Sequence, residues 1–234
     1  MFAASYLTAI SSSLSIRKGI SLSINRLNQF LIYMIGIVIL AAGITINTKT
    51  ALGVSPVISL AFNAATIACV SIGMGTFLYY LFLILVQFLL LIKNFQTVQL
   101  LQVFASFLTS FFIQFYDTIL PQPDGLVWRV LGVFLGVLLT GIGASITVAM
   151  QLIPNPADAL ANTIGFVLNK SFGFGKNLLD LVCIALAVLV GFIFGRGLLG
   201  VGIGTLIAMI LTGRVVAWCH PFSEKLYDKY VVKS

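Results

Sequence analysis

Charged residues are scarce in this chain of 234 residues. They make up 8% of the sequence, with six acids against thirteen Lys and Arg, whereas a soluble globular domain carries about 25% charged residues. Hydrophobic residues make up 60%, and the mean hydropathy is +1.12. A water-soluble fold would expose far too much apolar surface. The composition therefore predicts an integral membrane protein.

One stretch has no charge at all. Residues 50–92 contain no Asp, Glu, Lys or Arg. A single helix of that length, at about 1.5 Å per residue, would be roughly twice as long as the hydrocarbon core of a bilayer is thick. The segment must fold back within the membrane, and Ile72-Gly73-Met74-Gly75 is the predicted turn.

Other scarcities exclude classes of function. The sequence has one histidine, His220, and no Ser/His/Asp set, metal-binding cluster or carboxylate pair. We therefore expect no enzyme, no metal and no cofactor. The three cysteines suggest no disulfide framework. Basic residues lie at the ends of apolar segments, which is typical of topology signals, so we expect no nucleic-acid partner.

Eight apolar segments of helical length follow one another along the chain. A Pro- and Gly-containing linker at 119–125 separates two groups of four. We therefore predict membrane units at 26–118 and 126–219, flanked by an N-terminal cytoplasmic tail or interfacial segment at 1–25 and a cytoplasmic C-terminal tail at 220–234. The predicted helices are 27–48, 55–71, 75–93, 99–118, 126–150, 155–170, 176–195 and 197–219.

The two groups match when the sequence is shifted by one hundred residues. Without any gap, Pro56 falls on Pro156, and four glycines fall on glycines: Gly36, Gly43, Gly73 and Gly75 on Gly136, Gly143, Gly173 and Gly175. The pattern predicts an all-α polytopic membrane protein of two tandem four-helix repeats, the second helix of each short. Four spans per repeat would make the copies parallel. Three spans with a re-entrant helix would make them inverted, and both alternatives stay open.

The distribution of basic residues predicts the orientation. With either span count, ten of the thirteen basic residues fall on the side of the two termini. By the positive-inside rule, both termini are cytoplasmic in a multi-pass protein of the bacterial inner membrane.

The second helix of each repeat carries most of the polar residues. Ser55-Pro56 and Asn155-Pro156 each place a preferred N-cap residue before a proline. Such helix starts, if they face an aqueous site, favour an anionic or polar solute; alternatively, the two side chains only cap their own helices. Polar residues also recur at helical spacing and either line a solute path or bond neighbouring helices. The candidate binding residues are Ser55, Ser59, Asn63, Asn155, Asp158 and Asn162.

Four charged residues of the second half allow a specific interpretation, which is functional or structural for Asp158 and Arg214 and structural for the other two. Asp158 is either a carboxylate that compensates the helix dipole or the coupling group for a proton or cation. Lys176 and Asp180 stand four residues apart and predict an ion pair on one helix face. Arg214 either holds an anion or extends to the cytoplasmic surface.

Several short motifs resemble the YczE/YyaS/YitT-type family of bacterial integral membrane proteins. They are Leu52-Gly53-Val54-Ser55-Pro56, Gly73-Met74-Gly75-Thr76, and Gly202-Ile203-Gly204-Thr205 followed by Gly213. The similarity covers about residues 30–215 and is greatest to the YczE branch. It implies a polytopic bacterial membrane protein and supplies no substrate.

These features favour a small-solute transporter or facilitator whose path runs between the two repeats. The alternative is a non-transporting accessory subunit of a larger transport or secretion complex. The expected partners are the lipid bilayer and a small-molecule solute, with a homo-oligomer or a membrane partner subunit also open.

Overall fold

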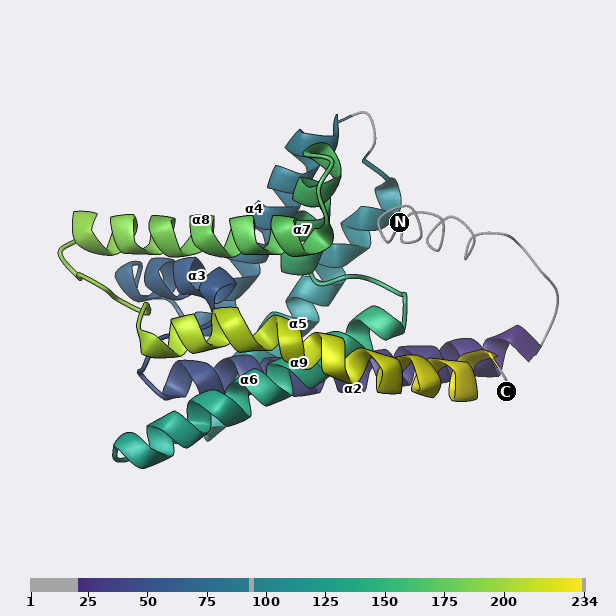
Figure 1. The fold of residues 1–234 in the computed structure, drawn as a ribbon, viewed down its shortest axis with the longest axis horizontal. Helices are drawn as coiled ribbons and strands as arrows, with labels where there is room; N and C mark the ends of the chain where they lie inside the picture. The colour runs from purple at the N-terminus through teal and green to yellow at the C-terminus, as the bar shows by residue number, and fades with distance from the viewer. Residues whose placement is uncertain (1–20, 93–94, 233–234) are drawn as a thin grey trace.

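The protein is an all-helical membrane protein. A computed structural model describes residues 21–92 and 95–232, so most of the predicted N-terminal tail lies outside the described residues. No strand occurs in the described ranges, which form eight α-helices (Figure 1). They are α2 (Ser21–Lys49), α3 (Pro56–Ile67), α4 (Ile72–Leu91), α5 (Gln102–Ile119), α6 (Leu126–Ala149), α7 (Pro156–Val167), α8 (Phe172–Ile193) and α9 (Ile203–Tyr227). A 3-10 turn, η2 (Thr97–Leu101), precedes α5, and a π-helical turn, η3 (Asp228–Val232), follows α9.

Six of the described helices are long and apolar enough to cross a membrane: α2, α4, α5 with η2, α6, α8 and α9. The other two, α3 and α7, have 12 residues each. At about 1.5 Å per residue they are roughly 18 Å long and cannot cross a hydrocarbon core of about 30 Å. The prediction of a polytopic helical membrane protein is confirmed, with six spans and two short helices.

Structural details also coincide at a spacing of one hundred residues. Ser71 and Ser171 cap α4 and α8 in the same way, each accepting a hydrogen bond from a backbone N–H three residues later. The short helices α3 and α7 are each followed by a residue in the left-handed region, Cys69 at φ 55° and Asn169 at φ 52°. Each left-handed residue ends the short helix and reverses the chain into the next span.

Helices α2 and α6 cross in close contact through four glycines. A Cβ atom at Gly136 would lie 2.9 Å from the carbonyl oxygen of Gly43, and one at Gly143 would lie 2.7 Å from that of Gly36. Residues later in α2 therefore contact residues earlier in α6, so the two helices are antiparallel. Small residues permit such backbone contact in membranes. Because α2 is the first helix of the first half and α6 the first helix of the second, these two helices run in opposite directions.

Each short helix runs back along the span that follows it. A Cβ atom at Gly75 would lie 2.5 Å from Cβ of Ala65, so the start of α4 packs on the end of α3. In the second half, Gly175 similarly contacts Ala161 and Gly165. If the antiparallel pairing is continued from these contacts toward the starts of the short helices, α3 begins level with Tyr80 and α7 level with Asp180. Each of these residues is the ninth of its span. The short helices therefore start deep in the protein and end near its surface.

Two boundaries differ from the predicted ones at α9. The helix begins at Ile203 rather than at 197, because three glycines before it, Gly195, Gly197 and Gly200, take left-handed φ angles of 67°, 62° and 68°. At its other end, α9 continues to Tyr227 through Pro221. Neighbouring groups in membrane helices can satisfy the carbonyl that such a proline leaves free.

Candidate functional site

The start of α7 is fixed to α4 by an asparagine and a tyrosine. Asn155 occupies the N-cap position, and its Oδ1 accepts a hydrogen bond of 3.0 Å from the backbone N–H of Ala157. Its Nδ2 donates to the Oη of Tyr80 at 3.5 Å. One side chain therefore caps α7, as predicted, and also holds the helix start against the middle of α4.

A pair of buried glutamines holds the same helix start from α4 and α5. Gln87 and Gln102 are fully buried and exchange amide hydrogen bonds of 3.2 and 3.1 Å. Gln87 Nε2 also donates to the carbonyl oxygen of Pro156 at 3.2 Å. Because each amide satisfies the other, these groups are stable inside a membrane protein. The position of α7 is therefore specified by α4 directly and by α5 through Gln87.

One lysine lies between two carboxylates next to this helix start. The Lys176 Nζ is 3.7 Å from an Asp158 oxygen and 3.5 Å from an Asp180 oxygen. We call these three residues the charge cluster. The exposed fraction of the side chain is 26% for Lys176, 23% for Asp158 and only 6% for Asp180. The predicted Lys176–Asp180 ion pair is present, and Asp158, from the first turn of α7, is a second partner.

The charge cluster has a net formal charge of −1, since two ionised acids face one lysine. The N-terminal end of the α7 dipole is positive and offsets part of this charge at Asp158. Asp180 receives no such help and is the most buried of the three. In a medium of low dielectric constant, a site with an excess negative charge attracts a proton or a metal cation and disfavours an anion.

Side chains from α4 and α8 enclose the buried end of the charge cluster. Tyr79 Oη and Cys183 Sγ are 3.1 Å apart, and both residues are buried. Cys183 follows Asp180 by three residues, so it lies on the same face of α8. Tyr79, Tyr80 and Cys183 thus bring hydroxyl and thiol groups close to the carboxylates.

The equivalent place in the first half of the chain carries no charge. One hundred residues before the three members of the charge cluster stand Ile58, Thr76 and Tyr80. Thr76 is fully buried, and its Oγ1 has no hydrogen-bond partner among the described residues. The two halves therefore share a backbone arrangement but differ in chemistry.

The predicted residues of α3 have structural contacts. Ser55 stands at the N-cap position with φ −54° and ψ 142°, but its side chain makes no capping hydrogen bond, so the expected cap is wrong in this half. Ser59 is fully buried, and its Oγ donates to the carbonyl oxygen of Pro56 at 2.6 Å. Both serines thus lie at the start of α3, and neither forms a hydrogen bond to the charge cluster.

Asn63 joins two helices of different halves. It is fully buried, and its Nδ2 donates to the carbonyl oxygen of Ala187 in α8 at 2.7 Å. This contact fits the interpretation in which the polar stripe of α3 bonds neighbouring helices. In the second half, Asn162 is partly exposed on α7. Asn169 follows the end of α7 with a left-handed backbone, so it does not share a helix face with Asn162.

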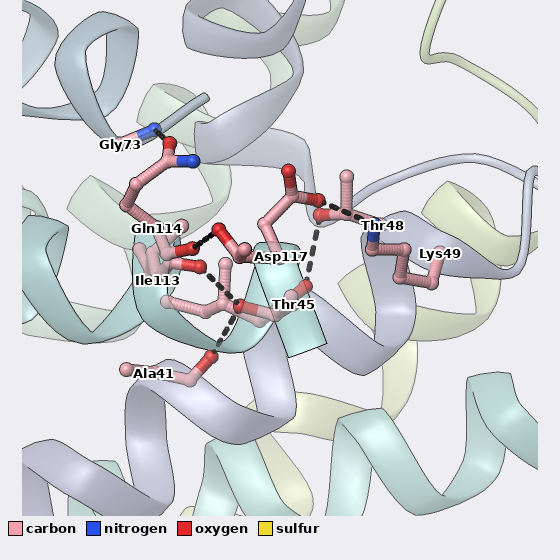
Figure 2. A network of polar contacts seen from close by, with 10 residues as sticks. Ala41, Thr45, Thr48, Lys49, Gly73, Ile113, Gln114 and Asp117 are labelled. Atoms are coloured by element: carbon pink, nitrogen blue, oxygen red, sulfur yellow. Dashed lines mark hydrogen bonds and ion pairs between the residues drawn. The ribbon is translucent and has the colours of Figure 1, made fainter. Parts of the chain in front are cut away.

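A second polar cluster joins α2, α4 and α5 (Figure 2). Lys49, at the end of α2, pairs with Asp117 of α5 at 2.9 Å. One turn earlier, the Thr45 Oγ1 donates to the carbonyl oxygen of Ala41 at 2.9 Å and approaches that of Ile113 at 3.4 Å. Gln114 Oε1 accepts a hydrogen bond of 3.1 Å from the backbone N–H of Gly73, at the start of α4. These contacts hold the ends of α2 and α5 and the start of α4 together.

Several of these polar residues could not be singled out from the sequence, because each stands alone in an apolar segment. Tyr79, Tyr80, Gln87, Gln102 and Asp117 gain partners only when distant helices pack. One signal was available for Tyr80: the hundred-residue shift pairs it with Asp180, which marks an inward-facing position.

Comparison with known proteins places the chain in a family. A family model described as a family of unknown function (DUF6198) matches residues 27–221. The "Uncharacterized protein YyaS" of Bacillus subtilis (strain 168) is 24% identical over 200 residues, which cover 84% of this chain and 94% of that protein. No solved structure matches. The YyaS-type resemblance seen in the short motifs is confirmed, and the chain belongs to the DUF6198 family of unknown function.

Proposed function

We propose that the protein is a secondary transporter or facilitator for a small polar solute, coupled to a proton or a monovalent cation at the charge cluster. The observation that carries this proposal is the position of Lys176 between Asp158 and Asp180, within helices of the membrane-embedded part. Ionisable side chains inside membranes are costly and commonly mark ion pathways or proton relays.

The second acid is the feature that favours coupling over a purely structural role. One carboxylate is sufficient to neutralise Lys176, so a structural ion pair needs either Asp158 or Asp180 but not both. With both present, a bound proton or cation restores neutrality. Binding of the proton or cation weakens the ion pair between one acid and Lys176. The charge cluster then has a bound and an unbound state, and α7 and α8 can change position between them.

The opposite orientation of the two halves supports a transport path between them. We infer that the halves arose by duplication, since matching glycines, caps and left-handed residues recur one hundred positions apart. Inverted repeats with interrupted helices starting near the bilayer midplane are a common transporter design, with sites at the repeat interface. The starts of α3 and α7, beside Tyr80 and the charge cluster, are the corresponding places here.

The distribution of charges gives the proposed orientation. With six spans, Arg26, Lys170, Lys225 and Lys229 lie toward the end that carries the start of α2 and the end of α9. Asn28 Nδ2 and the Tyr230 carbonyl oxygen are 3.5 Å apart at that end. We assign this end to the cytoplasmic side of the bacterial inner membrane by the positive-inside rule.

The test is ligand-dependent stability of the purified protein in detergent. The panel contains small anions, amino acids, vitamins and monovalent cations, each measured at several pH values. A compound at about one hundred times its dissociation constant stabilises the fold by about 2.7 kcal/mol. We expect one class of compound to stabilise the wild type in a pH- or cation-dependent manner.

Two acid-to-amide variants test the assignment to the charge cluster. Asp158→Asn should lose the pH or cation dependence, whereas Asp124→Asn, in the exposed linker, should keep it. A folded Asp158→Asn protein that retains the dependence would contradict the coupling role. A broad panel without any shift, together with a stoichiometric membrane partner in purification, would favour the accessory-subunit alternative.

A further inference from the structure

A groove runs between α8 and α9 on the outside of the second half. Its volume is about 670 Å³, within the range of about 300–1,000 Å³ typical of small-molecule sites. Apolar side chains form most of the walls, among them Leu178, Leu181, Met209 and Ile210. Asn177 and Arg214 place polar groups at one end. The groove therefore has the amphipathic character of a lipid: a long apolar part and a single polar end.

The corresponding groove is closed in the first half. There α4 and α5 pack together, and Gln114 of α5 accepts a hydrogen bond from the Gly73 backbone at the start of α4. Arg214 and Gly173 are the residues one hundred positions later. Helices α8 and α9 pack less closely than α4 and α5 and lie apart in Figure 1. An arginine thus stands beside an open groove where the first half has a glutamine that closes it.

Arg214 lies level with the start of α8. It lines the groove together with Phe174 and Asn177, which belong to the first two turns of α8. These turns directly follow the exposed surface segment that contains Lys170. The Arg214 side chain is exposed and forms no ion pair with the described residues. An arginine without an acidic partner, beside an apolar groove of a membrane protein, is suited to bind an anion from outside the protein.

The protein offers no acid to Arg214. Asp117 pairs with Lys49, and Asp158 and Asp180 pair with Lys176. The remaining acids are Asp124 in the linker at the other end, and Glu224 and Asp228 at the far end of α9.

A second copy of the chain does not supply the anion either. A dimer about an axis along the membrane normal brings residues of equal depth together, so Arg214 would face Arg214 or Asn177 of the other copy. Charge complementarity therefore excludes this arrangement as the cover of the groove.

We propose that the α8–α9 groove binds an anionic phospholipid. Its phosphate group is held by Arg214 and Asn177, and an acyl chain lies along Leu178, Leu181 and Ile210. The Arg214 guanidinium gives the selectivity, because its fork of donors suits phosphate oxygens and because no acid lies beside it to balance its charge. The proposal is independent of the coupling role of the charge cluster, which involves other faces of α7 and α8.

The experiment measures lipid binding to the purified full chain by native mass spectrometry and by thermal unfolding. The added lipid is phosphatidylglycerol or phosphatidylcholine, and inorganic phosphate is tested separately. We expect phosphatidylglycerol to bind and stabilise the wild type more strongly than phosphatidylcholine. In Arg214→Gln, which installs the residue of the first half, the affinity should fall on the order of tenfold, the effect of losing one charge-assisted contact.

Two further variants separate loss of charge from loss of fold. Gly213→Leu fills the groove without removing Arg214, and a Cβ atom at Gly213 meets nothing within 4 Å, so the fold accommodates it. It should weaken phosphatidylglycerol binding. Arg196→Gln, an exposed arginine at the other end of α8, should bind like the wild type.

Three results would overturn the proposal. The first is equal phosphatidylglycerol binding by the wild type and Arg214→Gln. The second is equal stabilisation by inorganic phosphate, which would identify a site for a free anion. The third is a lipid-free dimer that Gly213→Leu dissociates, which would identify the groove as an interface between copies.

Discussion

Adding one methyl group at the crossing of α2 and α6 should separate the two helices. In Gly143→Ala, the new Cβ would lie 2.7 Å from both the Gly36 carbonyl oxygen and the Leu40 Cα. The Leu40 backbone nitrogen would lie closer still. Because ordinary contacts of this kind begin at 3.4 Å, the backbones must move apart by at least 0.7 Å, from 3.4 minus 2.7. None of these obstacles is a side chain that can rotate away.

The free-energy cost can be estimated from overpacking. Inserting a methyl group into a well-packed region costs about 1–3 kcal/mol. Replacing Gly by Ala inside a helix returns about 1 kcal/mol of helix propensity. The net loss for Gly143→Ala is therefore roughly 0–2 kcal/mol, and we expect the upper end because the new Cβ meets backbone atoms. At Gly213 the same methyl group meets nothing within 4 Å, so Gly213→Ala should gain about 0.5–1 kcal/mol.

Thermal unfolding of both variants in one detergent measures the difference. For a chain of this size, 1 kcal/mol corresponds to about 2–4 °C in Tm. We expect the Tm of Gly143→Ala to fall by several degrees and that of Gly213→Ala to stay level or rise slightly. Equal changes in the two variants would refute the close crossing, because helix propensity alone treats both positions alike.

Three further predictions concern topology, charge and packing. An impermeant thiol reagent should label Cys69 from one side of the membrane and Asn169→Cys, in a Cys69→Ser background, from the other; labelling from the same side would contradict the inverted arrangement. Lys176→Met should lose about 3 kcal/mol because it leaves two acids without a cation, and the double variant Lys176→Met/Asp180→Asn should recover much of this in chemical unfolding; no recovery would show that the loss is not electrostatic. Asn63→Leu should lose about 1–2 kcal/mol, since the α3–α8 hydrogen bond disappears, and an unchanged Tm would argue against this bond.

Much of the fold could be predicted from the sequence, because its strongest signals are local. Long apolar runs predict spans directly, and Pro156 after Asn155 correctly predicts the start and cap of α7. The Lys176–Asp180 pair was equally accessible, because four residues in a helix bring two side chains to one face. Asp158 was singled out, but its partner Lys176 lies on another helix, and only packing brings them together.

The remaining features depend on contacts between distant segments. Whether the halves are parallel or inverted follows from the direction in which Gly36 and Gly43 meet α6, and periodicity does not contain this information. The pair of Gln87 and Gln102 likewise requires α4, α5 and α7 to converge. The number of basic residues on the side of the two termini is the same for six and for eight spans, so the charge distribution could not decide the span count.

The glycine crossing also determines how one half of the chain can move against the other. Backbones that touch through Gly43 and Gly136 can rotate about the point of contact but cannot approach further. The crossing is a fulcrum. A rotation of about 10° there would displace a group ten residues along the helix, about 15 Å away, by roughly 2.6 Å. A shift of that size exceeds the tolerance of a hydrogen bond, so a small tilt at the centre can break polar contacts at one membrane face while leaving the crossing intact.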